Sequence, residues 1–293
     1  MIRYLSKANV LALSLLLVFL ASCNNSPDGE SERTLEIVYT DWSESVAITY
    51  LSYVLLEEKM DYKVTLKLTD VETAYKEVGT DKADVFTDAW LPETQKQYYN
   101  AYKDEIELLG ITYPEARTGL VVPAYSELKS IADLKSYSHP IIGIDAGAGV
   151  MQKTQAAIAK YELKNQLLDL TEEKMLEQLE DSIHRRNEIV VTGWEPHWIF
   201  ARYDVRFLED PDNIFGQTEN IYTIANKKLH ETHPNAVRFF ERMQLTEKQL
   251  NSLVYEVSLS EDPVNGAKAW IGQNEFVVNQ WIKNLTRERK KIM

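Results

Sequence analysis

The feature that most constrains the fold is an alternation of apolar and amphipathic segments that runs through the chain twice. In the first round, segments with strand character lie at 35–40, 62–68 and 85–86. They are separated by segments at 43–55 and 71–78 in which apolar residues recur at helical spacing. Strands that alternate with helices in this way are typical of a parallel sheet covered by helices. This part of the chain is therefore predicted to form an α/β layer.

The same alternation of strands and helices begins again after an apolar strand at 119–123. The second round comprises expected strands at 140–144, 167–170, 188–192 and 205–208, and expected helices at 149–162 and 175–183. A strand at 221–224 and a helix-rich segment from about 230 to 290 follow. Because this last segment is long enough to return to the first unit, we predict two α/β lobes around a cleft. Ligands of such folds bind in the crevice at the carboxyl ends of the strands.

The N-terminal segment predicts export and a lipid anchor. Arg3 and Lys7 precede an apolar run at 10–21, which is the pattern of a secretory signal peptide. The run ends in Leu20-Ala21-Ser22-Cys23, which resembles the lipobox of bacterial lipoproteins. The expected organisation is a signal peptide at 1–22, a lipid-anchored linker at 23–33, lobe I at 34–120 plus 217–293, and lobe II at 121–216. We expect an extracytoplasmic protein of the cell envelope, held to the membrane through the lipid on Cys23 alone.

Composition and motifs argue against several classes of function. The single cysteine leaves no disulfide framework and no CxxC metal site, and a net charge of −13 disfavours nucleic acid as a partner. The chain contains no HExxH, P-loop or GxSxG motif. Asp88, Asp145 and Glu195 lie near expected strand ends, and we interpret them as helix caps and structural acceptors; Glu44 lies at a helix start, where the helix dipole favours an acid. We therefore expect a binding protein without catalysis, cofactor or metal.

Three of the six tryptophans follow expected strands directly: Trp42, Trp90 and Trp194. Indoles at the carboxyl ends of strands are expected to point toward the cleft, whereas Trp270 and Trp281 lie in the helical tail and are expected to pack there. Indole faces attract cations, above all poorly hydrated ones. Because a quaternary ammonium group has a permanent charge but no N–H to donate, an aromatic cage is the physical means of binding it.

A glycine-rich turn supplies the second binding signal. The segment 147–150 follows an expected strand and precedes a helix. Amides at a helix N-terminus bind anions, and glycine lets a ligand approach the backbone. Together with an aromatic cage, this turn predicts a zwitterionic ligand, with its cationic head among the indoles and its carboxylate on the amides.

These segments carry a resemblance to the glycine betaine/proline betaine substrate-binding proteins of ABC importers, the OpuAC type. The resemblance extends from about 35 to 281 and is most specific at 88–92, 143–150 and 192–211. It implies a bilobal, periplasmic-binding-protein-like (type II) fold and delivery of the ligand to an ABC permease. It also implies that Trp42, Trp90 and Trp194 form the aromatic prism and that the amides of Gly149 and Val150 hold the carboxylate.

One position departs from the family pattern. The family typically reads Trp-Leu-Pro-x-Thr-His, with the histidine bonded to the carboxylate, whereas this chain has Gln95 at the last position. Gln95 donates a neutral hydrogen bond, and charge-assisted bonds are about twice as strong. His197 is a candidate compensating donor, or a histidine that packs at a helix start. The ligand is thus glycine betaine or a related quaternary-ammonium solute. The alternatives are another cation, such as choline, carnitine or an ectoine-like solute, and a sensory module without a role in transport.

Overall fold

The structure is a computed structural model that describes residues 33–285. Residues 34–285 belong to one compact unit. The predicted signal peptide, the anchor Cys23 and nearly all of the linker lie outside the described residues. Within residues 33–285, no helix combines the length and the apolarity that a bilayer crossing requires.

Strands and helices alternate as the sequence predicts. The strands are β1 (Thr34–Tyr39), β2 (Lys63–Leu68), β3 (Val85–Leu91), β4 (Ile106–Pro123), β5 (Ile141–Ile142), β6 (Leu167–Leu168), β7 (Val191–Glu195), β8 (Val205–Phe207) and β9 (Glu219–Asn226). The helices of the first half are α2 (Ser43–Met60), α3 (Val71–Gly79), α4 (Lys96–Tyr102), the 3-10 helix η1 (Ile131–Ser136), α5 (Gly149–Lys160) and α6 (Glu172–Arg185). Those of the second half are α7 (Ile199–Arg202), α8 (Leu229–Thr232), α9 (Pro234–Arg242), α10 (Glu247–Ser258), α11 (Pro263–Gln273) and α12 (Glu275–Trp281).

The sheet is mixed, whereas the strand–helix rhythm predicted a parallel one. Its strand order is β2-β1-β3-β9-β4-β7-β5-β6, with β8 paired to β4. β1 is parallel to β2 and β3, and β5 is parallel to β6 and β7, as the rhythm predicts. The difference comes from β4 and β9, which pair antiparallel with each other and with their neighbours. Residues 106–118, which lie N-terminal to the expected strand at 119–123, form most of β4.

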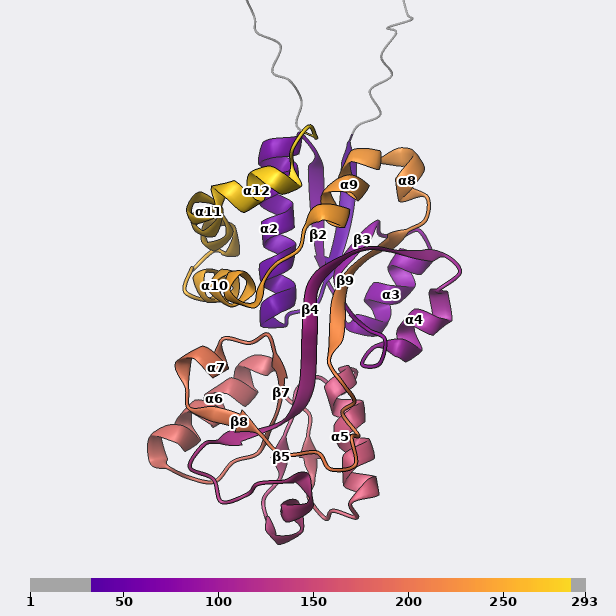
Figure 1. Cartoon of the computed structure of the whole chain (residues 1–293). Helices are drawn as coiled ribbons and strands as arrows, with labels where there is room; N and C mark the ends of the chain where they lie inside the picture. Colours follow the sequence, from indigo (N-terminus) through magenta and orange to yellow (C-terminus); the bar gives the residue numbers. More distant parts are fainter. Residues whose placement is uncertain (1–32, 286–293) are drawn as a thin grey trace, which may run out of the picture. The chain divides into compact units, whose positions relative to one another are not determined.

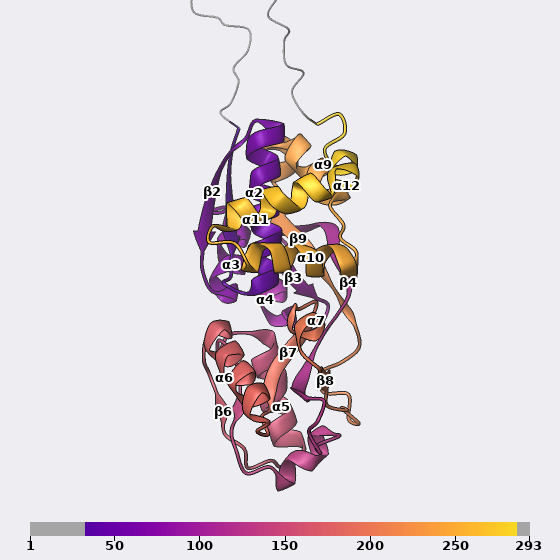
Figure 2. The ribbon, with the colours of Figure 1, turned by 90° about the vertical axis from the view of Figure 1, so that its left-hand side faces the viewer.

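The long strand β4 connects two lobes. It pairs with β9 as far as Ala116 and with β7 from Arg117 onward, and Figure 1 shows it running from one lobe to the other. We propose that lobe I comprises residues 34–116 and 219–285 and that lobe II comprises 117–218. The two boundaries between the lobes differ by four and two residues from those expected from the sequence. The view in Figure 2 shows the same two groups of elements, with α5, α6 and α7 in lobe II.

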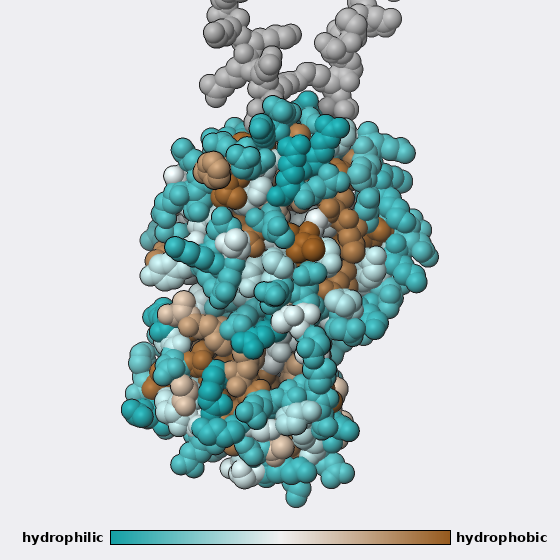
Figure 3. Space-filling view, viewed as in Figure 1, coloured by the Kyte–Doolittle hydropathy of each residue, from teal (hydrophilic) through white to brown (hydrophobic). Residues whose placement is uncertain are grey.

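Each lobe buries apolar faces of its helices against the sheet. Helix α2 is buried along most of its length in lobe I and packs against α10 and α11 of the C-terminal segment. Trp270 and Trp281 are buried there, with their rings stacked at a centroid distance of 6.3 Å. This confirms that they are packing residues. The face seen in Figure 3 is mainly hydrophilic, with smaller hydrophobic areas on both lobes.

A tryptophan-lined cavity between the lobes

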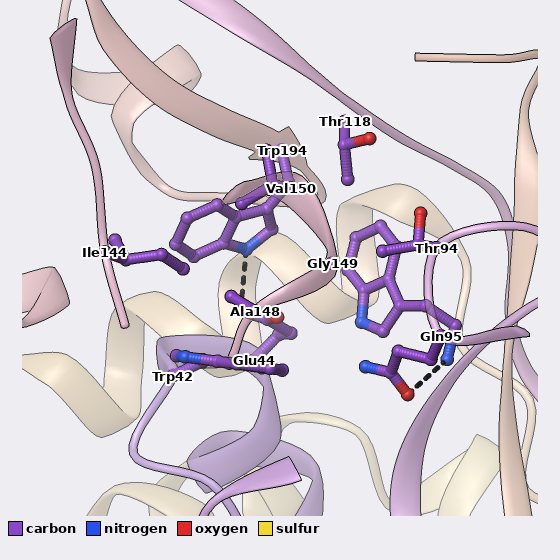
Figure 4. A pocket seen from close by; sticks show the side chains of 11 residues that line it. Trp42, Glu44, Thr94, Gln95, Thr118, Ile144, Ala148, Gly149, Val150 and Trp194 are labelled. Carbon is purple, nitrogen blue, oxygen red and sulfur yellow. Dashed lines mark hydrogen bonds between the residues drawn. The ribbon is translucent and has the colours of Figure 1, made fainter. Parts of the chain in front are cut away.

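A cavity lies where the two lobes meet. It contains about 290 Å³ of space not occupied by protein atoms, which includes the space at its opening. A concave site of this kind suits a small molecule. Eleven residues line it (Figure 4): Trp42, Glu44, Trp90, Thr94, Gln95, Thr118, Ile144, Ala148, Gly149, Val150 and Trp194. The structure thus brings together six of the seven ligand-binding candidates from the sequence, and His197 is the exception.

The ends of three strands position the three cage tryptophans. Trp42 follows β1 and precedes the first residue of α2. Trp90 and Trp194 lie inside β3 and β7, each one residue before the end of its strand, and not after the strand as expected. Both strands extend further than their apolar runs, because pairing with β9 and β4 continues through these residues. All three indoles are buried.

Each of the three indole N–H groups donates a hydrogen bond to a carboxylate. The distances are 3.2 Å from Trp42 Nε1 to Asp145 Oδ2, 2.9 Å from Trp90 Nε1 to Asp88 Oδ1, and 2.8 Å from Trp194 Nε1 to Glu44 Oε2. These bonds hold the rings in place by one edge. The interpretation of Asp88 and Asp145 as structural acceptors agrees with these bonds, and Glu44, which the sequence analysis related only to the helix dipole, accepts an indole proton as well.

Glu44 is the functional candidate that sequence reasoning missed. It lies two residues after Trp42 in the first turn of α2, is 1% exposed, and lines the cavity. Burial raises the pKa of Glu44 well above its ordinary value, and the neighbouring carboxylates of Asp88 and Glu172 add to this, while the bond from Trp194 opposes it. The sequence signal was its spacing from Trp42, which places both residues at one end of one helix.

The turn before α5 provides unpaired backbone donors. Gly149 and Val150 are the first residues of α5, and their amides have no acceptor within the helix. The preceding Ala148 has no side chain that could cap them. Both residues line the cavity, so these amides are available to an anionic group of a ligand.

Gly149 also permits close approach of the two lobes. A Cβ atom at this position would lie 2.9 Å from the carbonyl carbon of Thr94 and closer still to the carbonyl oxygen and Cγ2 of that residue. Gly147, two residues earlier, faces open space, because a Cβ there would meet only the Tyr98 hydroxyl at 3.8 Å. Glycine is therefore required sterically at 149 and not at 147.

Gln95 is held with its amide nitrogen free to donate. Its Oε1 accepts from the Tyr75 hydroxyl at 3.0 Å and from the Trp90 backbone N–H at 3.1 Å. With the oxygen occupied, the Nε2 group is left as the donor that Gln95 offers to the cavity, as Figure 4 shows. Position 95 thus needs an acceptor for two protein donors as well as a donor for the ligand.

His197 does not line the cavity. It is 1% exposed and lies against Trp194, with ring centroids 4.8 Å apart. Its Nδ1 accepts from the Ile199 N–H at 3.2 Å, so the proton is assigned to Nε2, which bonds Glu172 at 3.1 Å. Because both ring nitrogens have protein partners, we propose that His197 supports Trp194 and Glu172 and does not contact a ligand.

Glu172 of α6 joins the lobes at the start of α2. Its carboxylate accepts from the Ser43 backbone N–H at 2.9 Å and from the Ser43 hydroxyl. An acid at a helix N-terminus is stabilised by the helix dipole. Here the acid comes from the opposite lobe, and Trp42, at the N-cap position, makes no side-chain cap bond.

Further contacts join the lobes around the cavity. The Tyr98 hydroxyl donates to the Gly147 carbonyl at 2.8 Å and accepts from Gln152 Nε2 at 3.0 Å. The bonds from Trp42 to Asp145 and from Trp194 to Glu44 also run between the lobes. The structure therefore has the lobes closed over the cavity.

Glu219 fixes the loop that carries Thr94. It lies at the start of β9, beside the point where β4 passes between the lobes. Its carboxylate accepts from the N–H groups of Glu93 and Thr94, each at 3.0 Å, and from the Thr94 hydroxyl. Lys153 of α5 lies 3.6 Å away, so a cation from lobe II faces this acid.

Residues 33–273 match the family described as the substrate binding domain of ABC-type glycine betaine transport systems. The match covers most of the chain. The chain belongs to this family. It accordingly contains a substrate-binding domain of the ABC-transport type, and it has the bilobal α/β fold expected from the sequence.

Individual relatives agree with this assignment. The glycine betaine/carnitine transport binding protein GbuC of Listeria monocytogenes is 37% identical over 169 residues, which are 57% of this chain and 56% of that relative's length. The crystal structure of lactococcal OpuAC with glycine betaine has a TM-score of 0.82 and 31% identity, covering 86% of this chain and all of that one. The ProX protein of Borrelia burgdorferi has a TM-score of 0.79 and 29% identity, covering 85% of this chain and 96% of its own.

Proposed function

We propose that this protein captures a quaternary-ammonium solute in the cavity between its lobes and presents it to an ABC permease. The observation that carries this proposal is the lining of the cavity. Three indoles from both lobes meet there, and the one ionisable side chain among the lining residues is the carboxylate of Glu44. Such a lining favours a cation that needs no hydrogen-bond acceptor.

The energetics suit a ligand of this kind. Each desolvated cation–π contact contributes about 1–2 kcal/mol. Three contacts therefore supply much of the roughly 8 kcal/mol that micromolar binding requires. The ligand would bridge the lobes and stabilise the closed state through its higher affinity for that state. It is bound and released unchanged, so no catalytic step is involved.

Glycine betaine is the first candidate ligand. The amides of Gly149 and Val150 and the Nε2 group of Gln95 offer donors for its carboxylate. The relatives GbuC and OpuAC are described as binding or transporting glycine betaine, and GbuC carnitine as well.

Choline is the second candidate, and Glu44 is the observation that favours it. No cationic side chain lines the cavity among the described residues, so a ligand carboxylate would lack a charged partner there. A ligand with a hydroxyl in place of the carboxylate avoids repulsion by Glu44.

Titration followed by intrinsic tryptophan fluorescence tests the proposal. Glycine betaine, choline and carnitine are compared with glycine and ethanolamine, the unmethylated counterparts of the first two. We expect micromolar binding of at least one trimethylated ligand and binding about 100-fold weaker, or none, for its unmethylated counterpart. Millimolar or weaker binding of all three trimethylated ligands would rule the proposal out.

The substitution Gln95→Glu separates the two candidates. Oε1 of the glutamate can still accept from Tyr75 and Trp90, while the second oxygen places a negative charge where Nε2 donated. At pH 8 we expect betaine affinity to fall about tenfold or more through like-charge repulsion, and choline affinity to stay the same or rise. The exposed Gln217→Glu is the matched control for charge. Equal losses for both ligands would show that Gln95 does not mark the anionic end.

Lipid anchoring at Cys23 is a further part of the proposal. With Cys23→Ala, we expect the protein to leave the membrane fraction, because this substitution removes the proposed site of the lipid chains that anchor it. Ligand affinity should not change, since residue 23 precedes the folded unit. Fractionation followed by immunoblotting measures the first effect, and fluorescence titration measures the second. Retention of Cys23→Ala in the membrane fraction would contradict the anchor.

A further inference from the structure

The indole N–H of every cage tryptophan donates a hydrogen bond to a carboxylate. The acceptors of the indole protons are Asp145, Asp88 and Glu44. They come from three separate places in the sequence: the turn before α5, strand β3 and helix α2. An indole N–H can be satisfied by a carbonyl, a hydroxyl or water, so three carboxyl acceptors for three rings are a feature beyond the need to satisfy a donor.

These carboxylates have no cationic partner. Among residues 33–285, none of the three lies within 4.0 Å of the charged group of a lysine, arginine or histidine. Glu44 and Asp88 are buried completely or nearly so, at 1% and 0% exposure. Buried charges are normally paired. A cation in the cage would be the counter-charge that this group of residues lacks.

We propose that Asp88, Asp145 and Glu44 determine the cation selectivity of the cage by acting on its indole rings. An anion that accepts the N–H bond polarises the indole and increases the electron density that faces the ligand. Asp88 and Asp145 do not line the cavity, so they act through Trp90 and Trp42 as positioning residues. Glu44 lines the cavity and also attracts the ligand directly. This inference rests on the proposed function and adds to it the residues that distinguish a cation from a neutral molecule of the same shape.

The ionisation of the buried pair is coupled to cation binding. Burial raises the pKa of both Glu44 and Asp88, and their proximity raises that of Glu44 further. A positive ligand head in the cage opposes both effects and favours the ionised carboxylates. Cation binding and ionisation of the pair therefore support each other.

The test compares a cation with its neutral carbon isostere. The pair is choline with 3,3-dimethylbutan-1-ol, measured by calorimetry on the wild type and on Asp88→Asn, Asp145→Asn and Glu44→Gln. Each substitution retains an oxygen that can accept the indole proton and removes the charge. Glu195→Gln is the matched control, since Glu195 follows Trp194 directly but pairs with Arg117 at 2.8 Å and bonds no indole.

We expect the ratio of cation affinity to isostere affinity to fall about tenfold in Asp88→Asn and Glu44→Gln. In Asp145→Asn, it should fall about two- to threefold, because this residue is half-buried and its charge is partly screened. Isostere affinity should change less than twofold in all variants, and the control should keep the wild-type ratio. Indole ¹H–¹⁵N resonances of the three tryptophans report whether each hydrogen bond is retained.

Two outcomes overturn the inference. Equal losses for the cation and its isostere would mean that the carboxylates only hold the rings in place. An unchanged ratio in Asp88→Asn and Asp145→Asn would mean that their charge does not reach the ligand. Asp145 lies in a half-buried turn, so its variant keeps the test valid if a buried substitution prevents folding. Failure of the proposed function is a different result, in which the wild type binds no quaternary-ammonium ligand.

Discussion

Replacing Gly149 by alanine is expected to weaken ligand binding about 10- to 100-fold. The added methyl group would overlap the backbone of Thr94, which belongs to the opposite lobe. That backbone cannot move easily, because Glu219 holds the N–H groups of Glu93 and Thr94. Overpacking of a rigid contact costs about 1–3 kcal/mol, and each 1.4 kcal/mol is a factor of about ten in affinity. The cost falls on the closed state, which is the state that holds the ligand.

Calorimetric titration with the best ligand of the wild type measures this effect. Gly147→Ala is the matched control, since its methyl group would face open space, and its affinity should stay within about twofold of the wild type. The melting temperature of unliganded Gly149→Ala should change little, whereas the rise in melting temperature on ligand addition should shrink. Wild-type affinity in Gly149→Ala would show that the lobes need not close as tightly as in this structure.

Removal of a cage indole is the second change with a large expected effect. For Trp194→Ala and Trp90→Ala we expect affinity for the cation to fall about 100-fold. The ligand loses a cation–π contact of about 2 kcal/mol together with apolar contact, and Glu44 or Asp88 loses a hydrogen-bond donor while remaining buried. Trp42→Ala should weaken binding by a similar factor, because it also removes a bond between the lobes.

The matched control for this series is Trp281→Ala. Trp281 is buried against Trp270 in the C-terminal helices and does not line the cavity. Its loss should lower the free energy of unfolding by about 3–5 kcal/mol while the folded fraction binds ligand normally. Denaturant unfolding gives the first quantity and calorimetry corrected for active fraction gives the second. Normal affinity in all three cage variants would refute the aromatic cage.

Much of the fold was accessible from the sequence because secondary structure follows local periodicity. The apolar alternation at 62–68 and the helical spacing at 71–78 correspond to β2 and α3 within one residue. The prediction of a parallel sheet was only partly correct, because the sequence does not indicate that β4 would run through both lobes. Its segment 106–118 contains charged and turn-forming residues in register with apolar ones, so no clean pattern marks it as a strand.

Only part of the candidate site could be predicted from the sequence, because several of its contacts join residues that are distant along the chain. Trp42, Trp90 and Trp194 were identified because ligands of α/β lobes bind in the crevice at the carboxyl ends of the strands. Glu44 was assigned to the helix dipole, since a sequence does not reveal that an acid in a first helical turn will be buried against an indole from another lobe. The sequence likewise does not indicate that the backbone N–H of Ser43 donates to Glu172 of α6.

What the sequence by itself determined is therefore the order of strands and helices, the two-lobed organisation and the tryptophans at the strand ends. Each of these depends on residues close together along the chain. The tertiary structure alone decided which carboxylate meets which indole, where Gln95 directs its amide, and that His197 lies outside the cavity. The bonds from Trp42 to Asp145 and from Trp194 to Glu44 join residues 103 and 150 positions apart. Such contacts depend on how the two lobes close on each other. Local secondary-structure propensity carries no information about contacts between residues so far apart in the sequence.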